Sequence, residues 1–179
     1  MTPTRNDPPF TRIKIRVAAL VFCGDDVALI RRDRPPHGAH YSTIGGNVEG
    51  PEPLPNALAR ELQEELGLDL GDATAPELLW VLDQRVSRPG PTPPPRKMHL
   101  IFRLHVTPVV RTKLRTEEHD ELPGGSVDVG AIEWVDYRET DDLHIYPPVG
   151  HHLAALHTPR AAIADAALEA ITDANFTWR

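Results

Sequence analysis

Glu61, Glu64 and Glu65 are spaced so that their carboxylates could act together in metal chemistry. In a helix of 3.6 residues per turn, residues three and four apart lie on the same side, so these side chains would share one sector. Hard cations such as Mg²⁺ or Mn²⁺ prefer carboxylate oxygens, and they complete their coordination with water and substrate phosphates. The spacing therefore predicts a divalent-metal site on one face of a helix.

This arrangement would be costly in a helix with a purely structural role. Like charges at these spacings repel, and Glu64 and Glu65 fall in the last turn, where the helix dipole disfavours anions. Glu65 also projects on the same side as Leu54 and Leu58. Each departure costs about 0.3–1 kcal/mol, and local rules tend to be broken where function requires it. The alternative is a solvated acidic patch, partly balanced by Arg60.

A glycine-rich turn over residues 45–50 (GGNVEG) precedes this helix and favours the functional interpretation. Glycines allow the backbone to approach a ligand closely and leave its carbonyl and N–H groups accessible. The helix is expected over residues 54–66, with prolines confined to its first turn and Gly67 ending it in the left-handed conformation. The turn and the helix together predict two walls of one site.

Read at fixed spacing, residues 46–68 resemble the complete Nudix box. Gly46 is followed after five residues by Glu52, then after seven residues by Arg60-Glu61-Leu62, and after single residues by Glu64-Glu65 and Gly67-Leu68. The resemblance implies a metal-dependent hydrolase that cleaves a diphosphate linkage. Its substrate would be a small-molecule nucleotide, either a nucleoside diphosphate linked to another moiety or a nucleoside triphosphate.

The resemblance also implies roles for individual residues. Glu61, Glu64, Glu65 and the Gly45 carbonyl would hold Mg²⁺ or Mn²⁺. Arg60 and Glu52 would pair and brace the loop against the helix, with Gly46 as a further structural residue. A glutamate of the box, Glu64 or Glu61, or an acidic residue of a later loop would orient or deprotonate the attacking water, and we favour Glu64 over the loop acids.

Two further groups of residues are candidates outside the box. The family often recruits an acidic residue from a later loop, and the choice here is among Glu117, Glu118, Asp120 and Glu121, of which we favour Glu118. Substrate phosphates could be bound by the basic side chains before the glycine turn, which are Arg31, Arg32, Arg34, His37 and His40. A strand end with a solvated basic loop would explain the same residues equally well.

The secondary-structure elements that must position these residues are expected to include both strands and helices. Strands are expected over residues 13–23, 27–31, 41–44, 78–86, 98–110 and 131–135, with a polar segment over 111–128 and a proline-rich loop over 88–97. A C-terminal helix is expected to begin at Thr158 and Pro159. Residues 1–12 are expected to form a flexible tail, and residues 13–179 one domain. The fold class predicted is α/β, a Nudix-like α/β/α sandwich with a curved mixed β-sheet between helices.

Composition argues against several other functional classes of protein. A net charge of −7 argues against nonspecific nucleic-acid binding, and no apolar run is long enough to span a membrane. The single cysteine, Cys23, rules out an intramolecular disulfide and favours the cytoplasm, and the histidines lack zinc-site spacing.

Two alternatives stay open on the same fold. A noncatalytic nucleotide sensor would usually carry a further DNA-binding domain, and a prenyl diphosphate isomerase would have an altered box, so the intact box favours a hydrolase. Residues 83–86 (DQRV) contain neither the proline typical of ADP-ribose hydrolases nor the tyrosine typical of dinucleoside polyphosphate hydrolases. The substrate therefore stays open, and a homodimer is suggested by family habit alone.

Overall fold

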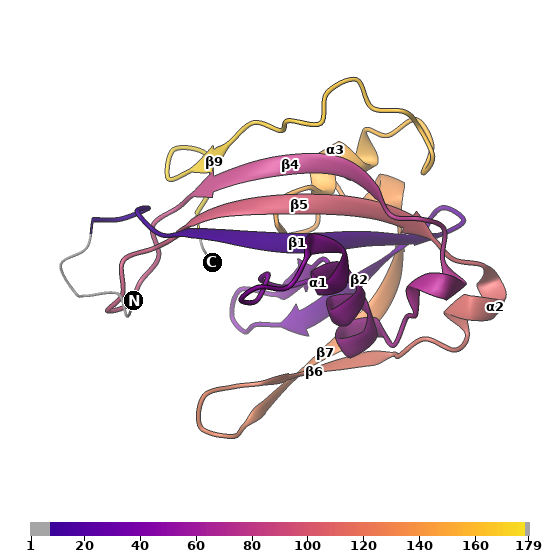
Figure 1. The fold of residues 1–179 in the computed structure, drawn as a ribbon, viewed down its shortest axis with the longest axis horizontal. Helices are drawn as coiled ribbons and strands as arrows, with labels where there is room; N and C mark the ends of the chain where they lie inside the picture. The colour runs from indigo at the N-terminus through magenta and orange to yellow at the C-terminus, as the bar shows by residue number, and fades with distance from the viewer. Residues whose placement is uncertain (1–7, 178–179) are drawn as a thin grey trace.

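The computed structural model describes residues 8–177, and they form one mixed sheet with helices on both faces. Most of the predicted flexible tail, residues 1–7, lies outside the described residues. The strands follow the order β6-β7-β2-β1-β5-β4-β9, while β3 pairs with β2 and β8 (Figure 1). Their bounds are β1 Ile13–Cys23, β2 Asp26–Asp33, β3 Ala39–Ser42, β4 Glu77–Arg85, β5 Arg96–His105, β6 Glu117–Glu121, β7 Val127–Asp136, β8 Ile145–Tyr146 and β9 Ile171–Thr172. The predicted fold class is confirmed.

The helices are short. They are α1 (Leu54–Glu61), continued by the π-helix η1 (Leu62–Leu66), the 3-10 turns η2 (Leu70–Asp72) and η3 (Tyr137–Glu139), and the single turns α2 (Pro108–Arg111) and α3 (Gly150–Ala154). The predicted helix over residues 54–66 is confirmed, and Gly67 ends it at φ 68°. Its last part winds as a π-helix rather than an α-helix. In the described part of the chain, no helix has the length and apolar character needed to span a membrane.

The long strand β1 separates two apolar cores, because its side chains alternate between the faces of the sheet. Val17, Ala19 and Val21 pack under α1 and η1, while Leu20 and Phe22 pack on the other face with α3. β1 pairs in parallel with β5 along its length and antiparallel with β2 at its end. At its start the remaining edge of β1 is covered by the glycine turn, through bridges from Arg16 to Asn47 and from Ala19 to Ile44.

The predicted C-terminal helix is wrong. Residues 158–170 contain no helix, and this segment follows the edge of β4 (Figure 1). Val81 N donates to Ala166 O at 2.7 Å, and Leu168 N donates to Val81 O at 3.0 Å. Ile163 and Leu168 still reach the second apolar core. The open edge of β4 therefore supplies backbone partners that compete with the helix.

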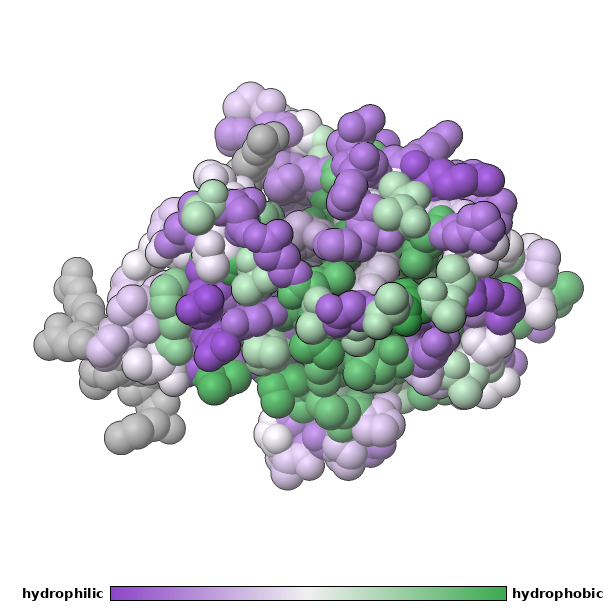
Figure 2. Space-filling view, turned by 90° about the horizontal axis from the view of Figure 1, so that it is seen from above, coloured by the Kyte–Doolittle hydropathy of each residue, from purple (hydrophilic) through white to green (hydrophobic). Residues whose placement is uncertain are grey.

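Two other boundaries differ from the prediction. The strand expected over 98–110 ends at His105, because Thr107 caps the single turn α2 and accepts from Val110 N at 3.3 Å. The polar segment 111–128 contains β6, which forms a hairpin with β7 through a turn at residues 122–126. This hairpin projects from the body of the sheet in Figure 1. Seen from above, the molecular surface carries a continuous apolar area among polar side chains (Figure 2).

Candidate active site

The glycine turn lies against the π-helix so closely that side chains are excluded from it. Gly46 O accepts from Val17 N at 3.0 Å, which fixes the turn to β1. A Cβ added to Gly46 would lie 2.2 Å from Glu61 Oε1, and one added to Gly45 would lie 2.2 Å from Val17 O. Gly45 also has φ 136°, which favours glycine. Gly46 is therefore required by close packing of the turn on the carboxylate helix, and Gly45 by its close packing on the backbone of β1.

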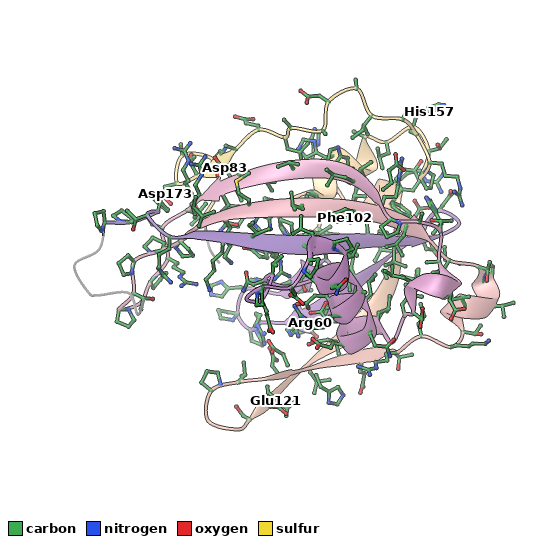
Figure 3. The ribbon with its side chains drawn as sticks, in the orientation of Figure 1. Arg60, Asp83, Phe102, Glu121, His157 and Asp173 are labelled. Carbon is green, nitrogen blue, oxygen red and sulfur yellow. The ribbon has the colours of Figure 1, made fainter. Side chains whose placement is uncertain are left out.

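Arg60 ties the helix to the loop that precedes it, and Figure 3 shows it on α1 on one side of the sheet. Its guanidinium donates to both oxygens of Glu52, at 2.8 and 3.2 Å, and to Asn47 O at 3.2 Å. Glu52 Oε1 also accepts from Glu49 N at 2.8 Å. The hydrogen bonds from Arg60, followed by that from Glu49, lower the pKa of Glu52 below its usual value. The pair predicted from the resemblance is thus formed.

Glu61 and Glu65 are the two box carboxylates that turn inward. Glu61 is buried and accepts from Arg60 Nη1 at 2.8 Å, while Glu65 accepts from Gly45 N at 2.7 Å. Burial raises the pKa of both, and that of Glu65 reaches about 8. The Gly45 hydrogen bond opposes this rise, and the charge of Glu61 adds to it. Burial therefore disfavours the charged form of both carboxylates, and a bound cation would favour it.

Glu64 occupies a different position from the other two. Its side chain is 58% exposed and is paired with Arg60 at 3.2 Å. Helical spacing alone placed it beside Glu61 and Glu65, but the chain after Glu61 follows the wider π turn. As placed, no group of three acidic, histidine or cysteine side chains in residues 8–177 is close enough to hold a metal. The fit to a metal therefore rests on donor chemistry and on the two inward carboxylates.

Glu118 is the acidic residue of β6 that faces this centre. It is buried, whereas Glu117, Asp120 and Glu121 are exposed. Its charge contributes to the raised pKa of Glu65, and burial raises its own pKa. Arg32 forms an ion pair with Glu118. Of the four acids weighed from the sequence, Glu118 is the one brought next to the box.

The three arginines considered as phosphate ligands are all ion-paired. Arg31 pairs with Asp33 at 3.1 Å and with Glu133 at 3.0 Å. Arg32 pairs with Glu118 and, at 3.1 Å, with Asp128, which also pairs with Arg34. As placed, these guanidiniums neutralise carboxylates of β2, β6 and β7.

The two histidines of that group are separated from this network. His37 is exposed, and the ring of His40 lies 4.6 Å from that of His144, measured between centroids. Neither ring is paired with the acidic centre by any contact among the described residues.

Comparison with known proteins identifies this arrangement. A family model described as the NUDIX domain matches residues 13–154. The chain belongs to the Nudix family. No curated protein matches it.

Solved Nudix structures share its architecture. A MutT protein from Bacillus halodurans is 20% identical, with a TM-score of 0.50, over 78% of this chain and 79% of that chain. An Ap4A hydrolase from C. elegans, solved as a binary complex, is 14% identical, with a TM-score of 0.51, over 78% of this chain and 92% of that chain. At these identities the likeness shows the fold.

Sequence reasoning missed a polar cluster on the sheet face opposite the Nudix helix. Arg16 donates to the Gly45 carbonyl, and its charge lowers the pKa of Glu61 and Glu65 relative to burial alone. Lys97 Nζ donates to Tyr146 Oη at 2.9 Å. The alternation of basic and apolar residues from Arg12 to Arg16 was the available signal, since alternate residues of a strand share a face.

Proposed function

We propose that this Nudix protein is a divalent-metal-dependent hydrolase that cleaves a diphosphate linkage. Its substrate would be a nucleoside diphosphate linked to another moiety, or a nucleoside triphosphate. The observation that carries the proposal is the pair of inward carboxylates, buried Glu61 and half-buried Glu65, set against a glycine turn. Burying two anions together is costly unless a cation balances them. Carboxylate oxygens match Mg²⁺ or Mn²⁺, and the Gly45 carbonyl, which accepts from Arg16 in this structure, would add a further hard oxygen.

In this proposal Glu61, Glu65 and the Gly45 carbonyl hold the metal, with Glu64 and Glu118 as further carboxylates. When bound, the metal would neutralise diphosphate oxygens and lower the pKa of bound water. The Gly45 N–H keeps the Glu65 carboxylate oriented, and the Arg60–Glu52 pair keeps the turn at its distance from the helix. The reaction rate then depends on how well these residues place the attacking oxygen in line with the diphosphate bond that is cleaved.

The proton of the attacking water would go to Glu64, with Glu61 as the alternative base. Both carboxylates pair with Arg60, so exposure distinguishes them. Glu64 is exposed to solvent and can release an accepted proton to bulk water, whereas Glu61 is buried and less free to exchange protons.

The test is turnover of a nucleotide panel with Mg²⁺ or Mn²⁺. The panel contains nucleoside triphosphates, ADP-ribose, nucleotide sugars, NADH and dinucleoside polyphosphates. We expect metal-dependent hydrolysis of at least one compound, reduced at least 100-fold in Glu64→Gln. Glu169→Gln removes the same charge from an exposed position remote from the site and should retain full activity. Tight nucleotide binding without turnover across the panel would instead indicate a noncatalytic sensor.

A further inference from the structure

A strip of basic side chains crosses the sheet face next to the glycine turn. Arg12, Lys14 and Arg16 alternate along the start of β1, so they share one face. Lys97 of β5 lies directly opposite Lys14 in the parallel register. Arg88 is close enough to lower the pKa of both lysines. We call these five residues the basic strip. Like charges opposite one another destabilise a sheet, so a structural role alone does not explain them.

The inner end of the basic strip is enclosed. Lys97 and Arg16 lie over the ring of Tyr146, at 5.3 and 5.9 Å from its centroid. Burial, followed by the charges of Arg16 and Arg88, lowers the pKa of Lys97 to about 8. The cation is thus held among other cations in a partly desolvated position, where an anion would be favoured.

Neither Arg16 nor Lys97 forms an ion pair with a described residue. Other enclosed arginines do, since Arg103 pairs with Glu77 at 2.7 Å and Arg60 with Glu52 at 2.8 Å. Within residues 8–177, two adjacent, partly buried cations without a carboxylate at ion-pair distance are unusual for a chain of net charge −7. An anionic ligand would supply the missing ion-pair partner.

Two buried nitrogen atoms at the inner end of the basic strip also lack hydrogen-bond partners among residues 8–177. Arg16 Nε and His99 Nδ1 are buried and have no partner among residues 8–177. His99 is fully buried, and its Nε2 lies 2.7 Å from Gln84 Oε1, which also accepts from Tyr146 Oη at 2.9 Å. Buried polar atoms without partners are rare in native proteins and call for a ligand, a water or an ion.

We propose that the basic strip binds a phosphate group of the substrate beyond the diphosphate that is cleaved. The preferred substrate would then carry at least one additional phosphate, as a longer polyphosphate chain or as a phosphate monoester on the attached moiety. This inference rests on the proposed function. Arg16 links the two regions, because it donates to the Gly45 carbonyl of the acidic centre. At about 3.3 Å per residue, the strip from Arg12 to Arg16 spans roughly 13 Å, which is long enough for more than one anionic group.

The first test is binding of inorganic tripolyphosphate to the metal-free protein, measured by calorimetry. We expect Lys97→Met to weaken binding at least 10-fold and Lys14→Met at least threefold. Lys113→Met removes the same charge at an exposed position after α2 and should change the affinity less than twofold. Thermal melting identifies any variant that does not fold. No binding to the wild type, or equal weakening by Lys97→Met and Lys113→Met, would overturn the proposal.

The second test separates the two sources of the additional phosphate. NADPH is compared with NADH for a phosphate monoester, and ATP with ADP for a polyphosphate chain. We expect at least a 10-fold preference in kcat/KM for the additional phosphate within one pair, lost in Lys97→Met and kept in Lys113→Met. Equal kcat/KM within both pairs would contradict the proposal. Lys97-dependent tripolyphosphate binding without hydrolysis of any compound would refute the hydrolase and leave the strip as a phosphate site.

Discussion

Arg60 determines the local geometry of the acidic centre because one guanidinium serves several acceptors. It bonds Glu52, Glu61 and the Asn47 carbonyl, so it links the loop to the helix and partly neutralises the centre. The charge of Glu52 in turn has Arg60 as its main partner. These contacts make the two residues act as a unit in positioning the turn.

A double-mutant cycle of Glu52→Ala and Arg60→Ala tests that coupling. Residues that orient metal ligands typically contribute 10- to 100-fold to activity, so each single variant should lose roughly that much kcat/KM. The double variant should be no worse than Arg60→Ala, because the interaction is already lost there. Additive losses would show that the residues act independently.

The buried side chain of His99 should make the free energy of unfolding depend on pH. Burial, followed by the charges of Arg16 and Lys97, lowers its pKa from 6.5 to about 3. Between these two values the unfolded chain binds a proton that the native protein does not. The free energy of unfolding should therefore decrease as pH falls below about 6.5, by up to about 1.4 kcal/mol per pH unit from this group.

Denaturant titrations between pH 7 and 4.5 measure this effect. The expected result is a shallower pH dependence for His99→Gln than for the wild type. His37→Gln makes the same change at an exposed site and should follow the wild type. Identical slopes for the wild type and His99→Gln would show that His99 does not contribute.

At the scale of elements, the site depends on how closely the glycine turn packs on the π-helix. A Cβ at residue 46 would overlap the Glu61 carboxylate, with its nearest oxygen 2.2 Å away. Gly46→Ala should therefore displace either the turn or Glu61 and reduce kcat at least 10-fold. In Gly71→Ala the nearest atom is a side-chain oxygen of Asp69 at 3.2 Å, so this control should stay active. A fully active Gly46→Ala would refute the packing argument.

Elements specified by local chemistry were predicted well from the sequence. The β1–β2 hairpin follows from an apolar run and a Gly-Asp-Asp turn, and the carboxylate helix follows from its box and Gly67. The C-terminal segment was not predicted, because its alanine-rich spacing fits a helix while the partner it prefers, the edge of β4, is remote in sequence. β6 was missed because its strand is almost entirely charged, although Gly124 and Gly125 marked the turn.

The residues of the site also divide into those that could be predicted from the sequence and those that could not. The Arg60–Glu52 pair was implied by the resemblance of residues 46–68 to the Nudix box, and helical spacing placed Glu61 and Glu65 in one sector. The exposure of Glu64 could not be predicted, because it depends on the π turn rather than on the sequence period. The cluster of Arg16, Lys97 and Tyr146 requires β1, β5 and β8 to converge, and no local pattern encodes that.

At the scale of the whole molecule, the sheet separates two regions of opposite charge. The acidic centre lies with α1 and η1, the basic strip lies on the other face, and Arg16 at the edge of β1 contacts the turn between them. An acidic protein that repels polyanions in general can thereby attract one at a single place. This arrangement requires a cation in the acidic centre if a diphosphate is to approach it.

The most direct test of that requirement is Mn²⁺ binding to the metal-stripped protein, followed by the loss of the free-ion signal in electron paramagnetic resonance. We expect saturable binding by the wild type, unchanged in Glu169→Gln and weakened at least 10-fold in Glu65→Gln. Equal Mn²⁺ affinity in all three proteins, or no binding to the wild type, would contradict the assignment of this centre as a metal site.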